Sequence, residues 1–203
     1  MRGDLTRLCL AGWLFALSIS ADAAPVDGRD PELFRQWAAS HDVGPFQRSL
    51  AAKGLQDVAP LYQLLRTASD WQRCGAEPFA IPPEQQWPAV ESTLELLKKL
   101  KAHGTLPRFE ILSAYRSPAL NRCANGAPSS AHARAFAVDL DLGEETESAA
   151  RLCDFWKREG QRWNMGLSRY PSGRIHIDTA GYRTWGEDHT CNTSFCLEPR
   201  NRR

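Results

Sequence analysis

Two short segments of the chain each offer an imidazole and a carboxylate. His132 and Asp139 lie seven residues apart in the stretch SSAHARAFAVDLDL, and His176 and Asp178 lie two residues apart in GRIHIDT. A metal site with three protein ligands and one open position uses side chains of these types. Because the two segments are far apart in sequence, the fold must bring them together if they form one site.

The alternation of polar and apolar residues predicts that both segments are strands with one polar face. In residues 137–142, Asp139 points away from the side on which the apolar residues lie. In residues 174–179, His176 and Asp178 share one face and the two isoleucines share the other. A lone histidine or aspartate on a strand is more often a solvent-facing or backbone-bonded group. The presence of two His/Asp pairs in matching strand contexts favours one metal site that both segments form together.

The remaining sequence predicts an α+β fold, with an N-terminal helical block packed against a small antiparallel sheet that carries the site. Helical spacing of apolar residues predicts helices at about 30–40, 46–53, 57–71, 87–103 and 145–159. Residues 109–115, 137–142 and 174–179 are the expected strands. We divide the chain into a signal segment (1–23), a helical N-terminal region (24–104), a core that carries the candidate metal site (105–190) and a C-terminal tail (191–203).

The first residues resemble a secretory signal. Arg2 and Arg7 precede an apolar run from Leu8 to Ile19, and small residues follow at 21–23. This pattern predicts cleavage by a signal peptidase after Ala23. The run is shorter than the roughly 20 residues that span a bilayer. We therefore expect a secreted or periplasmic protein with no stable membrane anchor after cleavage. A retained anchor is the alternative.

The charge and the cysteines bound the partners and the compartment. The formal net charge is +1, which gives no reason to expect nucleic acid as a partner. Five cysteines lie outside the signal, enough for two disulfides and one free thiol in an oxidising compartment. We expect Cys191 to pair with Cys196 and Cys74 with Cys123, which leaves Cys153 as a buried free thiol. The sequence does not predict the oligomeric state.

Three motifs together resemble the zinc D-alanyl-D-alanine carboxypeptidase family, which are peptidoglycan metallopeptidases of the LAS type. The first motif has the spacing Ser-x-His-x-x-(small)-x-Ala-x-Asp, and the others are SAYRSPALN upstream and HIDTAGYRTWG downstream. The first is met by Ser130, His132, Ala135, Ala137 and Asp139. The motifs occur in the family's order, and the similarity covers residues 109–185.

The resemblance implies a role for each matched residue. His132 and Asp139 correspond to the first two zinc ligands and His176 to the third, with the fourth position left for water. Arg116 is similar to the arginine that binds the substrate near the scissile carbonyl or its terminal carboxylate. Ser130 would orient a ligand or contact the substrate. The implied cofactor is Zn²⁺, and the implied partners are the peptide stems of peptidoglycan.

Two positions depart from the family pattern. Ala135 stands where the family usually has glycine, a small change if the backbone there does not need a positive φ. Gly173 stands where relatives often place the catalytic acid, three residues before the third ligand, and glycine cannot act as a base. Asp178 is then our candidate for the general base, on the same strand face as His176. In the other possible assignment Asp178 is the ligand and His176 is the base.

We therefore expect a secreted zinc metallopeptidase that cuts D-amino-acid-containing bonds in peptidoglycan stems, as a D,D-carboxypeptidase or a D,D-endopeptidase. Asp178 would take and return the proton, and Arg116 would stabilise the oxyanion together with zinc. The alternative is a non-catalytic module that binds zinc or the cell wall. The missing acid at Gly173 is the feature that favours the alternative.

Overall fold

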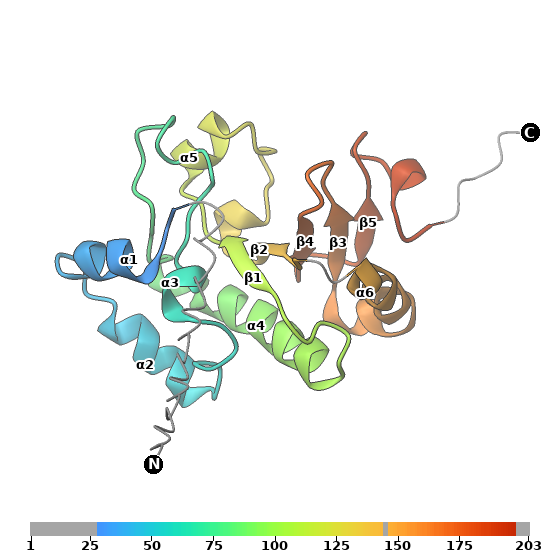
Figure 1. Ribbon diagram of the computed structural model, residues 1–203, viewed down its shortest axis with the longest axis horizontal. Coiled ribbons are helices and arrows are strands. Elements are labelled where there is room, and N and C mark those ends of the chain that lie inside the picture. The colour runs from blue at the N-terminus through green and yellow to red at the C-terminus, as the bar shows by residue number, and fades with distance from the viewer. Residues whose placement is uncertain (1–27, 144–145, 198–203) are drawn as a thin grey trace, which may run out of the picture.

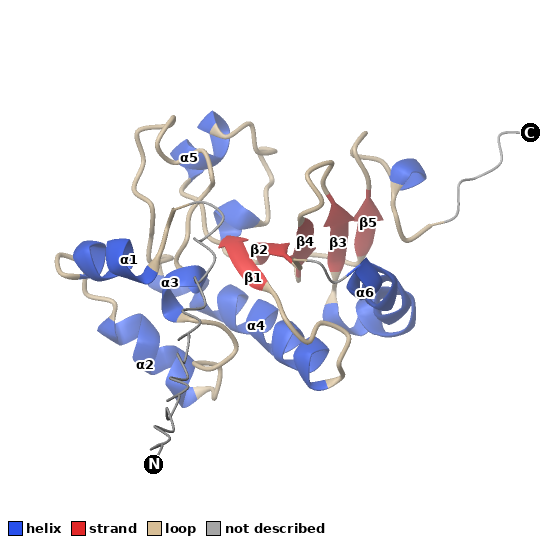
Figure 2. Cartoon of the chain, in the orientation of Figure 1, coloured by secondary structure: helices blue, strands red, loops and turns tan. Residues whose placement is uncertain are grey.

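A computed structural model describes residues 28–143 and 146–197 of the protein, and the expected signal segment lies outside these residues. The fold is α+β, as predicted, with helices around a five-stranded sheet (Figures 1 and 2). The helices are α1 (Pro31–Ala38), α2 (Gly44–Ala52), α3 (Leu61–Leu64), α4 (Trp87–Ala102), α5 (Pro118–Cys123) and α6 (Thr146–Glu159). The strands are β1 (Glu110–Ser113), β2 (Ala137–Asp141), β3 (Gly166–Arg169), β4 (Ile175–Asp178) and β5 (Arg183–Trp185). Short 3₁₀ turns are η1 (Glu84–Gln86), η2 (His132–Arg134), η3 (Gly160–Trp163) and η4 (Cys191–Thr193). Within the described residues, no helix is long and apolar enough to cross a membrane.

The sheet has the strand order β1-β2-β4-β3-β5. Its pairs are antiparallel except β3 with β5, which is parallel. Our expectation of a purely antiparallel sheet is therefore wrong at this edge. The reason is topological: the chain leaves β4 and returns on the far side of β3, and a strand antiparallel to β4 in that position must run parallel to β3.

Local sequence signals account for the ends of the longer helices. Asp30 caps α1 by accepting a hydrogen bond from the backbone N–H of Leu33 at 2.8 Å, with Pro31 in the first turn. Helix α4 ends at Ala102, and Gly104 follows with a positive φ of 66°. Helix α3 is much shorter than expected, because residues 65–67 instead pair with residues 78–80 as a β-bridge.

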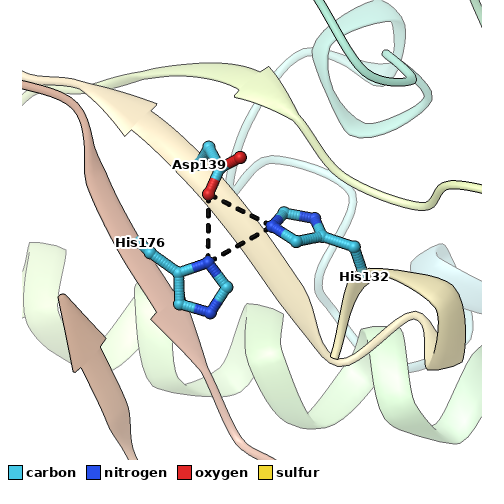
Figure 3. A group of neighbouring side chains, drawn as sticks. All are labelled: His132, Asp139 and His176. Carbon is cyan, nitrogen blue, oxygen red and sulfur yellow. Dashed lines mark hydrogen bonds and ion pairs between the residues drawn. The ribbon is translucent and has the colours of Figure 1, made fainter. Parts of the chain in front are cut away.

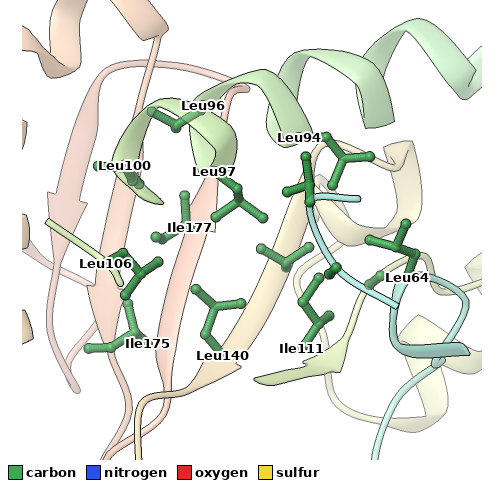
Figure 4. Close-up of a cluster of buried hydrophobic side chains, with 14 of the residues drawn as sticks. Leu64, Leu94, Leu96, Leu97, Leu100, Leu106, Ile111, Leu140, Ile175 and Ile177 are labelled. Atoms are coloured by element: carbon green, nitrogen blue, oxygen red, sulfur yellow. The ribbon is translucent and has the colours of Figure 1, made fainter. Parts of the chain in front are cut away.

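The core lies between α4 and one face of the sheet. Leu96, Leu97 and Leu100 on α4 are fully buried, as are Leu140 on β2 and Ile177 on β4, and Figure 4 shows them together. Burying a leucine or isoleucine side chain contributes roughly 1.5 to 3 kcal/mol each. This packing fixes which face of β2 and β4 points away from α4, and that opposite face carries Asp139 and His176.

Two buried arginines tie the first described residues to the sheet. Arg29 donates to the carbonyl oxygens of Thr67 at 2.8 Å and Leu112 at 2.6 Å. Arg66 donates to the carbonyl oxygens of Arg29 at 2.7 Å and Ile111 at 2.9 Å. Charge-assisted hydrogen bonds therefore hold residue 29, residues 66–67 and strand β1 together. The division of the chain at residue 104 remains a prediction.

The described part of the chain contains two disulfides. Cys74 pairs with Cys123, as expected. Cys153 pairs with Cys196, so the predicted Cys191–Cys196 bridge is wrong and Cys153 is not a free thiol. Cys196 is buried beside α6, whereas Cys191, at the start of η4, is exposed and is the free cysteine among residues 28–143 and 146–197. The second bridge joins the segment after β5 to α6, a tertiary proximity that close sequence spacing does not predict.

Candidate metal centre

Three side chains from three separate elements converge on one point (Figure 3). His132 comes from η2, Asp139 from β2 and His176 from β4, and all three are buried. Asp139 Oδ1 lies 3.1 Å from His132 Nε2 and 3.0 Å from His176 Nδ1, and the two ring nitrogens are 3.2 Å apart. These are the three residues that the sequence predicted as metal ligands, and the structure brings them together.

The strand register and one left-handed residue produce this convergence. Asp139 and His176 are directly paired across β2 and β4. His132 reaches them because η2 closes at Ala135, whose φ is 59°. Glycine adopts this positive φ at little cost, whereas an alanine here is strained by about 1 to 2 kcal/mol.

Each ligand is held from its far side by a second partner. His132 Nδ1 lies 2.7 Å from the carbonyl oxygen of Ala114, so this nitrogen is the donor and Nε2 is left with its lone pair. His176 Nε2 lies 2.9 Å from Asp178 Oδ2, which leaves Nδ1 for a metal. Asp139 Oδ2 is ion-paired with Arg116 Nη2, which leaves Oδ1. Outer partners of this kind orient metal ligands and fix their tautomers.

The charges around the group determine its protonation. Burial alone would raise the pKa of Asp139, but His132 and Arg116 hold that pKa well below its usual value. Burial lowers the pKa of His132, and the nearby Arg116 guanidinium lowers it further. Burial opposes the protonation of His176, yet hydrogen bonds to Asp139 and Asp178 raise its pKa. Asp139 and His132 are therefore already in the forms that bind a metal.

The donor set fits zinc. Two imidazole nitrogens and one carboxylate oxygen are the usual ligands of a catalytic zinc ion with an open fourth position. Bonds of about 2.0 to 2.1 Å at tetrahedral angles place ligand atoms roughly 3.3 Å apart. The observed separations of 3.0 to 3.2 Å are close to that spacing.

Asp178 lies behind His176 and away from the converging atoms. Its carboxylate is fully buried and accepts from the backbone N–H of Ala180 at 2.8 Å and from Arg183 at 2.8 and 2.9 Å. Burial would raise the pKa of Asp178, but His176 and Arg183 lower it. The metal-competent group contains His176 and not Asp178, which favours the assignment with His176 as the third ligand.

Two glycines shape the surroundings of His176. Gly166 is paired with Asp178 across β3 and β4, and a Cβ there would lie 2.2 Å from Asp178 Oδ2. A larger residue at 166 would therefore displace the carboxylate that holds His176. Gly173, the position at which the resemblance implied a catalytic acid, has a φ of 87° in the turn between β3 and β4.

The ligand group opens into a cavity of about 860 Å³. The guanidinium-bearing residues Arg116, Arg174 and Arg183 line this cavity, and Asp139 is the only carboxylate among its lining residues in the described chain. A cavity of this size can hold a peptide segment. A slightly larger cavity of about 970 Å³ lies near Glu110 and Asp141 and includes none of the three ligands.

The other predicted site residues also lie at this cavity. Arg116 Nε donates to Ser113 Oγ at 2.9 Å, so this side chain is held on two sides. Ser130 lines the cavity, and its hydroxyl oxygen accepts from the backbone N–H of His132 at 3.2 Å. This hydrogen bond closes a turn that positions His132. Whether Ser130 also contacts substrate stays a prediction.

Sequence reasoning missed two aromatic residues that border the third ligand. The Tyr170 hydroxyl lies 3.4 Å from His176 Nδ1, and the Trp185 ring packs edge-on against His176 with centroids 5.2 Å apart. Burial raises the pKa of Tyr170, so its hydroxyl stays protonated. The turn-forming sequence YPSG around Tyr170 gave no sign that this residue faces the site.

One of three comparisons with known proteins, the scan against family models, gives a match. The family model described as Peptidase M15 matches residues 63–178, more than half of the chain, and the match begins within the region that we assigned to the helical block. Searches of the curated proteins and of the solved structures found no match. Peptidases of the M15 family are zinc-dependent, and the three ligand atoms of this chain suit that metal. The chain therefore belongs to the peptidase M15 family.

Proposed function

We propose that this zinc-dependent peptidase hydrolyses D-amino-acid-containing peptide bonds in the stems of peptidoglycan, as a D,D-carboxypeptidase or D,D-endopeptidase. The observation that carries the proposal is the position of Arg116. Its guanidinium contacts a ligand carboxylate and also lines the cavity into which the ligand group opens. A peptide carbonyl or a terminal carboxylate that enters the cavity therefore meets a fixed positive charge beside the metal position.

When bound, zinc supplies Lewis acidity and lowers the pKa of water toward about 7. The protein's own contribution is to hold the ligands and the substrate. Arg116 would bind the developing oxyanion or the terminal carboxylate, and one such donor is worth roughly 3 to 4 kcal/mol in other hydrolases. Ser130 would hold the turn of His132 and border the substrate.

The role of Asp178 as general base remains a prediction, and its contacts favour a different one. A carboxylate with three hydrogen-bonding neighbours, buried behind His176, is placed to orient the imidazole and to hold the neutral ring in the tautomer with its proton on Nε2, so that the Nδ1 lone pair faces the metal position. We therefore propose that Asp178 is a positioning residue. Arg183 balances its charge.

We also propose that the protein acts outside the cytoplasm, secreted or in the periplasm. The Cys74–Cys123 and Cys153–Cys196 disulfides are compatible with an oxidising compartment. Peptidoglycan lies in such compartments, so the proposed location and the proposed substrate are consistent.

The test is to incubate the mature protein with purified peptidoglycan and with a pentapeptide ending in D-Ala-D-Ala. Products are identified by mass spectrometry, with added zinc and with a chelator. Cleavage should need zinc and should disappear in His132→Ala. His103→Ala, which alters an exposed histidine at the end of α4, is the matched control and should retain activity. Cleavage that persists with chelator or in His132→Ala would overturn the zinc mechanism.

The second candidate function is a non-catalytic zinc-binding or wall-binding module. It is favoured by the absence of a free carboxylate among the described residues that line the cavity, since Asp139 is a ligand and Asp178 lies behind His176. Stoichiometric zinc with no product from any peptidoglycan substrate would support this second candidate.

A further inference from the structure

The Tyr170 hydroxyl is an uncharged donor that lies beside the ligand group, 3.4 Å from His176 Nδ1. Tyr170 follows β3, and its backbone is fixed by hydrogen bonds from its own N–H to the carbonyl oxygen of Arg174 and from the N–H of Gly173 to its own carbonyl oxygen, both at 2.9 Å. Its ring stands perpendicular to that of His176, with centroids 6.3 Å apart. The short turn therefore aims the hydroxyl at the ligand atoms and into the cavity.

The acceptors around this hydroxyl are those that a metal would use. The hydroxyl lies 3.4 Å from His176 Nδ1, the nitrogen that faces the other two ligand atoms. Asp139 offers Oδ1 to the same group, and its Oδ2 is ion-paired with Arg116. When a metal engages those lone pairs, the hydroxyl loses its acceptor in the ligand group and is left facing the cavity that Tyr170 lines. A substrate oxygen in the cavity can then accept its hydrogen bond.

We infer that Tyr170 is a further catalytic residue, whose hydroxyl donates a hydrogen bond to the oxygen of the scissile carbonyl. The inference rests on the proposed function, because it assigns a donor for that same substrate. Arg116 and Tyr170 reach the ligand group from two different elements, the loop after β1 and the turn after β3. A substrate oxygen at the metal position would meet a charged donor from one and a neutral donor from the other. The hydroxyl keeps its proton in this role, so no proton transfer is assigned to it.

The test compares Tyr170→Phe with wild type and with Tyr182→Phe. Tyr182 stacks on Trp156 and is partly exposed, so its variant removes a hydroxyl without touching the ligand group. Three quantities are measured: kcat and KM on the D-Ala-D-Ala pentapeptide, zinc affinity by competition with a chelating dye, and binding of a phosphinate analogue of the tetrahedral intermediate by calorimetry. The zinc measurement does not depend on turnover.

For Tyr170→Phe we expect kcat to fall about 10²- to 10³-fold, the usual loss for one oxyanion donor. KM and zinc affinity should stay within about threefold of wild type, and phosphinate affinity should fall with kcat. Tyr182→Phe should match wild type in every measurement. This combination separates a donor to the reacting oxygen from a residue that supports the ligands.

Two results would overturn the inference alone. One is a Tyr170→Phe enzyme with wild-type kcat and phosphinate affinity. The other is a variant that loses zinc affinity in proportion to its activity, which would make Tyr170 a support for Asp139 or His176. If wild type binds zinc but neither cleaves the pentapeptide nor binds the phosphinate, the proposed function fails and the inference fails with it.

Discussion

Asp139 and His176 face each other directly across the antiparallel strands β2 and β4, with Oδ1 and Nδ1 3.0 Å apart. A slip of one residue in either strand would turn that side chain to the opposite face. The register is held by the burial of Leu140 on β2 and of Ile175 and Ile177 on β4 in the core cluster that also contains the leucines of α4. The geometry of the metal site is therefore set by the apolar face of the same two strands.

The contacts of Asp178 predict the effect of Asp178→Asn. If this carboxylate positions His176, zinc affinity should fall about 10- to 100-fold, the usual loss when an outer partner of a ligand is removed. Activity should then recover largely in excess zinc. Dye competition and kcat measured across a zinc titration check this, with the exposed Asp154→Asn as the control. A collapse of kcat with unchanged zinc affinity would instead identify Asp178 as the general base.

The protonation of His176 predicts how zinc affinity depends on pH. In the metal-free protein, hydrogen bonds to Asp139 and Asp178 outweigh burial and raise the pKa of His176 above 6.5. Zinc requires an unprotonated Nδ1, so binding displaces a proton and affinity rises with pH until the raised pKa is passed. His132, whose pKa is lowered, adds no proton in this range. Calorimetry in two buffers of different ionisation enthalpy should detect the released proton. An affinity that is flat between about pH 6 and 8 would contradict the assignment.

The periodic signals in the sequence predicted the parts of the site that depend on alternation and packing. The alternation of apolar residues with Asp139 on one strand and with His176 on the other predicted that each strand has one polar face. The spacing of the leucines predicted α4. Strand β5 was not predicted because three residues are too few to show a period, and β3 was not predicted because its sequence GLSR contains one large apolar residue and lies in a turn-rich segment. The position of Tyr170 depends on the pairing of β3 with β4, which the sequence does not reveal.

Two further features could not be predicted from the sequence for a related reason. One is the pairing of Cys153 with Cys196, and the other is the side of His176 on which Asp178 lies. Both are set by how elements distant in sequence pack together. Cys196 reaches α6 only because β5 adds to the far edge of β3. Asp178 turns behind His176 because Gly166 leaves space there and Arg183 pairs with it. Residue type and spacing do not contain that information.

The positive φ of Ala135 predicts that Ala135→Gly stabilises the protein. Glycine removes the strain of the left-handed conformation, about 1 to 2 kcal/mol, and loses roughly half of that gain to the greater freedom of the unfolded chain. The expected net gain is about 0.5 to 1 kcal/mol in the free energy of unfolding, measured by urea denaturation without added zinc. A destabilised Ala135→Gly variant would show that contacts of the buried methyl group outweigh the strain.

The buried arginines predict a large loss of stability in Arg66→Met. Removing this guanidinium leaves buried carbonyl oxygens of Arg29 and Ile111 without their donor and Glu110 without its partner. We expect the free energy of unfolding to fall by about 2 to 6 kcal/mol, because each of the two buried carbonyl oxygens left without its donor costs roughly 1 to 3 kcal/mol. The control Arg35→Met, at an exposed pair with Glu32, should change it by less than about 0.5 kcal/mol. A loss in Arg66→Met as small as in the control would rule out the structural role.

The coordination of zinc in the loaded protein tests the central claim most directly. An anomalous difference map from crystals of the zinc-bound protein should show one strong peak, about 2.0 to 2.2 Å from His132 Nε2, Asp139 Oδ1 and His176 Nδ1. Its fourth position should face the cavity that Arg116 and Tyr170 line. A peak bound through Asp178 or through His176 Nε2, or zinc bound only outside this group, would contradict the account.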